Sequence, residues 1–240
     1  MLLLSVYVLP FTSKNHGGPE AGEARVEVGH LDRFGSLLAS LARTQAARDP
    51  AMHEHAQRVR RYAVALAREV RIADGRMIEA IDMAALLHDI GKLGIPDRVL
   101  QKPRPLTREE YEQVKQHAVI GGELLSAVPF EGPLMLIVRH HHECWDGTGY
   151  PDRLSGEAIP LGARVLAVAD CYDALTSDRP YRAALSHETA IGIIEERRGT
   201  MYDPDLTDAF LKIVQRQRTG ARLARGGDAA RVTEQEARAV

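Results

Sequence analysis

The sequence predicts an all-α fold, and three observations support that prediction. Apolar residues recur at steps of three and four from Leu31 onward, which is the spacing of one face of a helix. No stretch of convincing length alternates apolar with polar residues, as a half-buried strand would. Proline, glycine and hydroxyl residues stand where the apolar stretches begin or end, as they do at helix boundaries.

The composition is that of a globular protein with a substantial core. The chain has 240 residues, of which 45% are hydrophobic and 27% are charged. Its formal charge of −2 is unlike that of a protein that coats nucleic acid, so no nucleic-acid partner is expected. Cys144 and Cys171 are far apart and form no C-x-x-C pair. This pattern fits a reducing compartment, and we expect a cytoplasmic protein.

Residues 1–30 are expected to form an N-terminal segment and linker. The apolar start, MLLLSVYVLPF, is interrupted by Pro10 and is much shorter than the roughly 20 residues of a membrane span. No basic residues precede it, as they would in a signal peptide. Residues 12–28 are polar and contain Gly17-Gly18-Pro19, which predicts a loop. No membrane span is therefore expected.

The first helices follow in order after this linker. An apolar stripe predicts a helix over 31–47, and residues 31–50 are expected to be a linker or signalling helix that could also form a homodimer. The stripe lasts only about two heptads, which is short for a coiled coil. Two further helices are expected over about 52–73 and 76–90, with Gly91 as the residue that ends the second.

The remaining helices complete a main domain over residues 51–218. Thr107 is expected to cap a helix that runs to about residue 127, because Glu109 and Glu110 follow it in an acidic first turn. Further helices are expected over 134–142, 161–175, 187–197 and 205–217. Residues 219–240 are rich in Arg, Gly and Ala, and they are expected to be a flexible tail.

Histidines and acids occur on the inward faces or at the ends of separate predicted helices. Asp170 interrupts an almost wholly apolar run, and a buried carboxylate is costly unless it is paired or bound to a metal. Each such residue alone could be a satisfied polar group of the core. Together they indicate a metal cluster, because imidazole nitrogens and carboxylate oxygens are ligands of borderline divalent metals. The candidates are His55, His88, Asp89, His117, His141, His142 and Asp170.

These candidates lie in segments that resemble a known family. The stretch HDIGK at 88–92 resembles the HD signature of the HD phosphohydrolase superfamily. The stretch HHECWDGTGYP at 141–151 resembles the second signature of its HD-GYP branch. Further matching segments are HAQRV at 55–59, KQH at 115–117 and ADCYDALTSDRPYR at 169–182, so the resemblance covers about residues 51–210. It implies an HD-domain helical bundle with C-terminal HD-GYP extension helices.

The resemblance also implies an activity. It implies a metal-dependent phosphodiesterase that hydrolyses the bacterial second messenger cyclic di-GMP to pGpG, with further hydrolysis to GMP left open. It implies a centre of two or three ions, usually iron or manganese, in which the seven candidates are ligands and Asp89 bridges two ions. Two such ions lower the pKa of water and hold a phosphate between them. Lys92 would offset charge that grows on the phosphate oxygens, or it is a solvated lysine beyond a helix end.

Four other residues are candidates for contacts with the substrate. Arg179 and Arg182 follow Asp170, and guanidinium groups suit a second phosphate or a guanine edge. Asp173 would orient a metal ligand or the water, or form an ion pair within its helix. Tyr150 would bring a phenol to the rim of the site, against the substrate or a signalling protein. Glu143 is expected to orient an imidazole through its second nitrogen.

One position departs from the family pattern. Members with three metals carry a glutamate one helical turn before the first histidine, whereas Ala51 stands four residues before His55 here. We therefore expect two ions. Two alternatives to an active cyclic di-GMP phosphodiesterase stay open: a hydrolase of another nucleotide, and a catalytically weak cyclic di-GMP sensor or protein-interaction module. The DGTGYP stretch argues against the first, and Lys92 with the complete ligand set argues against the second.

Overall fold

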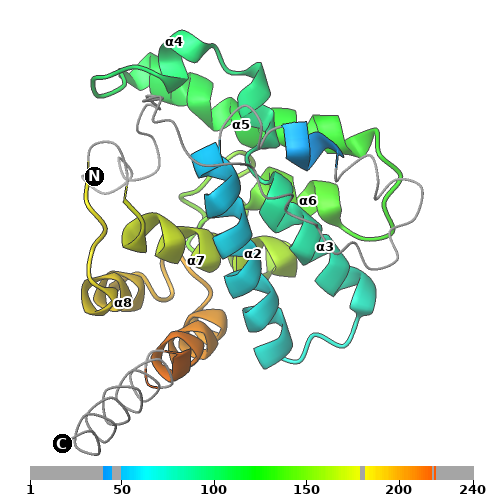
Figure 1. Cartoon of the computed structure of the whole chain (residues 1–240). Helices are drawn as coiled ribbons and strands as arrows, with labels where there is room; N and C mark the ends of the chain where they lie inside the picture. Colours follow the sequence, from blue (N-terminus) through cyan, green and yellow to red (C-terminus); the bar gives the residue numbers. More distant parts are fainter. Residues whose placement is uncertain (1–39, 45–49, 179–181, 218, 220–240) are drawn as a thin grey trace, which may run out of the picture.

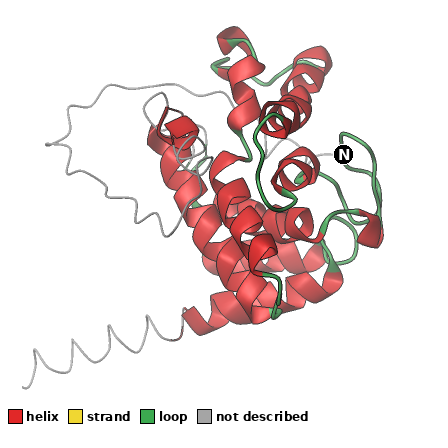
Figure 2. Cartoon of the chain, turned by 90° about the vertical axis from the view of Figure 1, so that its right-hand side faces the viewer, coloured by secondary structure: helices red, strands yellow, loops and turns green. Residues whose placement is uncertain are grey.

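The computed structural model describes residues 40–44, 50–178, 182–217 and 219, and Figure 1 draws the others as a thin grey trace. Among the described residues none forms a β-strand, and helices joined by loops make up the fold, as Figure 2 shows. The predicted all-α class is confirmed. No helix in this part of the chain is both long enough and apolar enough to cross a bilayer.

The helices follow one another closely along the chain. They are α2 Pro50–Glu69, α3 Gly75–Leu87, η2 Ile90–Gly94, α4 Asp97–Leu100, α5 Arg108–Ser126, α6 Leu134–His140, η3 Gly156–Ala158, α7 Leu161–Thr176 and α8 His187–Glu196. Residues 40–44 and 204–217 are also helical. The predicted cap of α5 is confirmed, since Thr107 Oγ1 accepts from the Glu110 amide and the Glu110 carboxylate accepts from the Thr107 amide.

Three predicted helices end earlier than expected. The helix expected to reach about residue 73 ends at Glu69. The helix expected to reach residue 90 ends at Leu87, and the chain continues through a turn into the 3-10 helix η2. Gly91 accounts for this path, because a Cβ atom there would lie 1.9 Å from the His117 carbonyl oxygen of α5. Similarly, α6 ends at His140, so His141 and His142 lie in the turn that follows it. Most of the helix expected over 31–47 lies outside the described residues.

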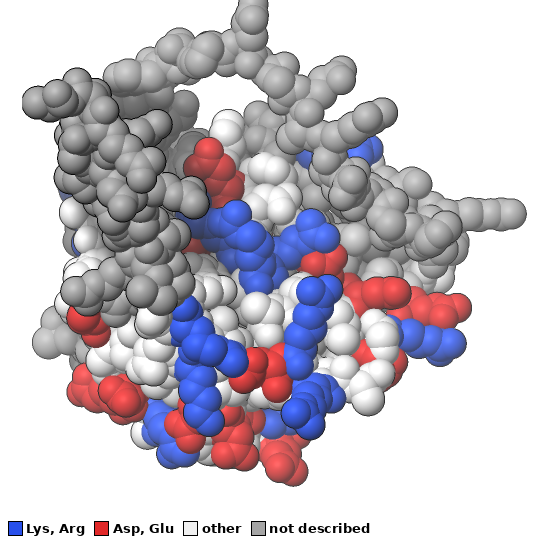
Figure 3. Space-filling model, turned by 60° about the horizontal axis from the view of Figure 1, so that its bottom comes forward, with Lys and Arg blue, Asp and Glu red and all other residues white. Residues whose placement is uncertain are grey.

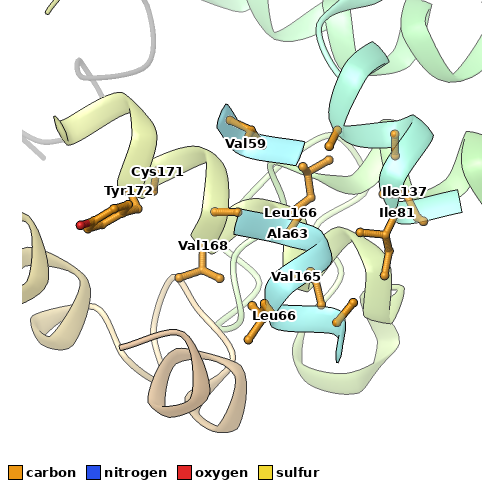
Figure 4. Packing of buried hydrophobic residues seen from close by; sticks show 14 of the residues in the cluster. Val59, Ala63, Leu66, Ile81, Ile137, Val165, Leu166, Val168, Cys171 and Tyr172 are labelled. Atoms are coloured by element: carbon orange, nitrogen blue, oxygen red, sulfur yellow. The ribbon is translucent and has the colours of Figure 1, made fainter. Parts of the chain in front are cut away.

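The main core lies where α2, α3, α6 and α7 pack together. Figure 4 shows Val59, Ala63 and Leu66 of α2 facing the side chains of α7, with Ile81 and Ile137 alongside. Burial of each Val, Leu or Ile side chain in this core stabilises the fold by about 1.5–3 kcal/mol. A smaller apolar cluster forms beneath α4 and α5, and it contains Ile95, Val99 and Val114.

The C-terminal helices pack onto the outer side of this bundle. In Figure 1, α8 and the helix at 204–217 lie at the lower left, with α7 between them and α5. Phe210 packs against Tyr172 of α7 and Tyr62 of α2, with ring centroids 5.3 Å and 5.9 Å apart. On the face drawn in Figure 3, basic side chains lie among acidic ones.

Candidate metal centre

Five segments of the chain bring the predicted metal ligands together. His55 comes from the first half of α2, His88 and Asp89 follow α3, His117 lies on α5, His141 and His142 follow α6, and Asp170 lies on α7. The side chains form two groups, each with its ligand atoms within 4.8 Å of one another. One group is His117, His141 and His142, and the other is His55, His88 and Asp89. Asp170 adjoins the second group, with Oδ1 3.1 Å from His55 Nε2.

Asp89 lies between the two groups. Its Oδ2 is 3.5 Å from His88 Nε2, and its Oδ1 is 3.6 Å from His117 Nε2. Each oxygen therefore faces a different group of histidines. Asp89 could therefore serve as a ligand to a metal ion held by either group.

Three of the histidines are oriented by the helices that carry them. In each, Nδ1 donates to the carbonyl oxygen three residues earlier, which leaves the lone pair on Nε2 for a metal ion. The pairs are His88 with Ala85 at 3.0 Å, His117 with Val114 at 2.7 Å and His141 with Val138 at 2.6 Å. The Nε2 atoms of His117 and His141 are 3.5 Å apart, so they face one another across the first group.

His55 is oriented differently, by side chains of α7 and α2. Its Nδ1 is 2.7 Å from Asp173 Oδ2, and Asp173 in turn accepts two hydrogen bonds from Arg58, at 2.6 Å and 3.1 Å. Burial opposes protonation of His55, but Asp170 and Asp173 outweigh it and raise the pKa of this imidazole to about 9. His55 is therefore protonated at neutral pH when no metal competes for its Nε2.

The other pKa shifts in the cluster favour metal binding, whereas His55 must first lose its proton. Burial lowers the pKa of His117 to about 4 and that of His141 to about 3, so both imidazoles are neutral at pH 7. Burial opposes ionisation of Asp89, but Lys92 and the neighbouring histidines outweigh it and hold its pKa well below the usual value. Neutral imidazoles and ionised carboxylates are the forms that bind divalent metals. The donor set thus fits a divalent metal centre.

The residues predicted to contact the substrate lie in different parts of the structure. Lys92 lies at the cluster, where its Nζ donates to Asp89 Oδ2 at 2.7 Å. Asp173 is only 1% exposed, and its oxygens are bonded to His55 and Arg58. Arg182 donates to the carbonyls of Ala174 and Leu175 at the C-terminal end of α7, at 2.5 Å and 3.2 Å. Arg179 lies outside the described residues.

Tyr150 lies beside His142, and its backbone is held close to the end of α6. The ring centroids of Tyr150 and His142 are 4.9 Å apart, and the Lys115 ammonium lies 5.4 Å from the centre of the Tyr150 ring. Gly149 permits this path, because a Cβ atom there would lie 2.3 Å from the Cys144 amide nitrogen. Tyr150 and His142 also line a small cavity of about 30 Å³ at this point.

Glu143 has a different role from the one expected. The His140 Nδ1 atom is 3.7 Å from Glu143 Oε1, which is too long for a hydrogen bond. Its buried carboxylate instead accepts from the backbone amides of Asp152 at 2.7 Å and Leu154 at 3.1 Å. Glu143 therefore anchors the loop that carries Tyr150. The roles of Glu143 and Arg58 were both missed at the sequence level, although Arg58 follows His55 by three residues on the same helix.

With this geometry in place, the comparisons with known proteins identify the family. The sequence model of the HD domain matches residues 40–206, a range that contains every residue of the cluster. The chain belongs to the HD domain family. The resemblance that the signatures at 88–92 and 141–151 indicate is thus confirmed.

Curated relatives of this HD domain are cyclic dinucleotide phosphodiesterases by name. The cyclic di-GMP phosphodiesterase response regulator RpfG of Xanthomonas campestris is 43% identical over 183 residues, which are 75% of this chain and 48% of that protein. A cyclic di-GMP phosphodiesterase of Thermotoga maritima is 43% identical over 170 residues, covering 69% and 45%. The 3'3'-cGAMP-specific phosphodiesterase 3 of Vibrio cholerae is 38% identical over 177 residues, covering 73% and 38%. The chain spans half or less of the length of these relatives.

Solved structures share the fold of this HD domain at low sequence identity. The Bdellovibrio bacteriovorus protein Bd1817, titled an HDG"Y"P protein, aligns with a TM-score of 0.59 at 18% identity, covering 76% of this chain and 63% of that one. The HD domain of Listeria monocytogenes PgpH in complex with cyclic-di-AMP aligns with a TM-score of 0.55 at 17% identity, covering 76% and 96%. These likenesses support the HD-domain bundle.

Proposed function

We propose that this HD domain is a metal-dependent phosphodiesterase that hydrolyses cyclic di-GMP to pGpG. The observation that carries the proposal is the pair of ligand groups joined by the two oxygens of Asp89. The relatives named cyclic di-GMP phosphodiesterases support the choice of substrate. Such an activity would act in bacterial signal transduction, and we propose a cytoplasmic location on that basis.

Two divalent ions, iron or manganese, would occupy the centre. His117, His141 and His142 would hold one ion, and His55, His88 and Asp170 would hold the other, with Asp89 between them. When bound, such ions activate water and neutralise charge on the phosphoryl group. Ala51 lies one turn before His55 in α2 and offers only a methyl group, which supports two ions over three.

Residues beside the centre would bind and orient the substrate. Lys92 stands next to Asp89 and is partly exposed, so its ammonium could neutralise charge on a non-bridging phosphate oxygen. Tyr150 presents its ring beside His142, where a base or sugar of the substrate would lie. Asp173 would act behind His55 by fixing the orientation of its ring. Contacts of Arg179 and Arg182 with the second phosphate stay predictions, and for Arg182 such a contact requires release of the α7 carbonyls.

The decisive test is an activity assay on purified protein. The chain, prepared without oxygen and loaded with Mn²⁺ or Fe²⁺, is incubated with cyclic di-GMP, and the products are separated by chromatography. We expect linear pGpG, and a loss of at least about 100-fold in His88→Ala, which removes a ligand. His53→Ala is the matched control, since His53 lies outside both ligand groups. Tight binding of cyclic di-GMP without any product would favour the sensor alternative.

A second substrate deserves the same assay. Relatives named 3'3'-cGAMP-specific phosphodiesterases are 34% to 38% identical to this chain, so hydrolysis of 3'3'-cGAMP is the second candidate function. Comparison of kcat/KM for the two cyclic dinucleotides distinguishes them. If kcat/KM is higher for 3'3'-cGAMP, that nucleotide becomes the proposed substrate in place of cyclic di-GMP.

Two interactions stay predictions from the sequence. One is a homodimer through the helix at 31–50, of which only residues 40–44 and 50 are described. The other is contact between signalling proteins and the loop that carries Tyr150. Light scattering of the whole chain and of a variant that begins at residue 50 would test the first prediction.

A further inference from the structure

A chain of polar contacts leads from the surface of α2 to the ligand atom of His55. The Arg58 side chain is 30% exposed, whereas that of Asp173 is 2% exposed. Arg58 donates through Nε to Asp173 Oδ1 and through Nη2 to Asp173 Oδ2, a two-pronged contact that fixes the plane of the carboxylate. Asp173 Oδ2 then accepts from His55 Nδ1. The opposite nitrogen of that ring, Nε2, faces Asp170 at 3.1 Å.

The orientation of the His55 ring depends on this series of polar contacts more than the orientation of the other histidines depends on their partners. Nδ1 of His88, His117 and His141 is held by a backbone carbonyl of the preceding turn, which the helix itself fixes. The partner of His55 is a side chain from another helix, which can rotate about its own torsions. The carboxylate of Asp173 is held in turn by other side chains: Arg58 donates two hydrogen bonds to it, and Ser177 Oγ donates a longer one at 3.3 Å.

We infer that Arg58 is a positioning residue for the metal centre, which acts through Asp173 to hold the His55 ring with Nε2 toward the ligand site. This inference rests on the metal centre of the proposed function. It assigns to Arg58 no contact with metal or substrate. Loss of Arg58 should therefore weaken binding of one ion only, the ion beside His55 and Asp170. The ion at His117, His141 and His142 should stay bound.

Arg60 offers a matched control two residues away on the same helix. It makes the same two-pronged contact with Asp82 of α3, at 2.6 Å and 2.7 Å, and its side chain is 31% exposed. The Arg60–Asp82 pair links two helices but touches none of the metal ligands. Loss of either arginine removes one ion pair between helices, so only a role at the metal centre separates the two variants.

The experiment measures metal content and affinity of the whole chain. Wild type, Arg58→Met, Arg58→Lys and Arg60→Met are loaded with Mn²⁺, passed through a desalting column and analysed by plasma emission, and Mn²⁺ binding is followed by calorimetry. We expect two ions in the wild type and in Arg60→Met. In Arg58→Met we expect one of the two ions to bind about 10-fold more weakly. Arg58→Lys should recover part of the loss, because lysine keeps the charge but not the two-pronged contact.

A double-mutant cycle tests whether Arg58 acts through Asp173. Asp173→Asn should weaken the same ion, and Arg58→Met should add little further loss once Asp173 is replaced. Equal metal content and affinity in Arg58→Met and Arg60→Met would overturn the inference and leave Arg58 as a link between α2 and α7. Independent effects of Arg58→Met and Asp173→Asn on metal affinity would overturn it as well. A wild-type chain that bound no metal would instead contradict the proposed function, and this inference with it.

Discussion

The histidines of the cluster show how a contact to one ring nitrogen can prepare the other to bind a metal ion. An imidazole has two nitrogens, and a partner on Nδ1 decides that Nε2 carries the free lone pair. His88, His117 and His141 obtain that partner from their own helices, and His55 obtains it from Asp173. The spacing between residues predicts which histidines share a face of a helix. The partner of Nδ1 depends on the rotamer and on the neighbouring helix.

Lys92 is expected to contribute to catalysis rather than to metal binding. Its ammonium contacts Asp89 Oδ2, so it carries positive charge to the edge of the centre. Lys92→Met should reduce kcat by about 100-fold, because charge on the phosphate is no longer offset, and it should leave both ions bound. Lys102→Met is the control, since Lys102 pairs with Glu110 at the start of α5. A loss of metal from Lys92→Met would assign the lysine a structural role.

Glu143 is expected to stabilise the loop after α6. In Glu143→Gln the side-chain NH2 group would face a backbone amide that needs an acceptor, at Asp152 or Leu154. A buried donor without an acceptor costs about 1–3 kcal/mol, so the free energy of unfolding should fall by that amount. Denaturant unfolding measures the change, and exposed Glu157 supplies the control Glu157→Gln. An unchanged free energy of unfolding would show that the loop is held by other contacts.

At the scale of elements, the site depends on how closely η2 approaches α5. A side chain at position 91 has no room, since its Cβ would lie 1.9 Å from the His117 carbonyl oxygen. The same close approach sets Asp89 beside His117. Glycine at 91 therefore matters for packing between two elements. It does not end α3, which stops at Leu87, because Gly91 lies within η2.

Gly91→Ala should destabilise the protein and disturb the metal centre together. The added methyl group must push η2 away from α5, at a cost of about 3 kcal/mol. Gly192→Ala in α8 is the control, because no atom lies within 4 Å of its added Cβ. Alanine there should stabilise the helix by about 0.5–1 kcal/mol. Thermal unfolding and Mn²⁺ content of both variants check the prediction, which fails if Gly91→Ala retains wild-type stability.

At the scale of the whole molecule, the helical bundle brings buried ionisable groups from five segments to one place. Burial alone disfavours charge on each of them. The cluster nevertheless holds Asp89 and Asp170 ionised. Lys92 and neighbouring histidines lower the pKa of Asp89, and histidines alone lower that of Asp170. The cluster holds its histidines in different protonation states: His55 is protonated, whereas His117 and His141 are neutral.

These protonation states predict how the stability of the metal-free protein depends on pH. The folded pKa of His55 is raised to about 9, so its contribution is complete below about pH 6.5 and is lost as pH rises through 9. The folded pKa values of His117 and His141 are lowered to about 4 and about 3. As pH falls below 6.5 the unfolded chain takes up protons before the folded one, so the free energy of unfolding decreases. Stability should therefore be greatest near pH 6.5.

Denaturant unfolding of metal-free protein between pH 5 and 9 measures this dependence. His55→Gln should remove the loss on the alkaline side and leave the loss on the acid side. A free energy of unfolding that rises from pH 6.5 to pH 5 would contradict the prediction.

Much of the fold and of the candidate ligand set could be predicted from the sequence because both depend on local pattern. Apolar spacing predicts the helices, and Thr107 with its acidic neighbours predicts the start of α5. Asp170 is conspicuous because a carboxylate in an apolar helix requires a partner. The end of α3 at Leu87 and the bonds of Glu143 could not be predicted, since both depend on residues distant in the chain.

The sequence by itself determined the all-α class, the family resemblance and the identity of the candidate ligands, because residue type and spacing carry that information. Only the tertiary structure decided that the ligands form two groups with Asp89 between them. It likewise decided that Asp173 lies behind His55 with Arg58 as its second partner. The physical reason is that hydrogen bonds between side chains of different helices depend on how those helices pack, which no single stretch of sequence specifies.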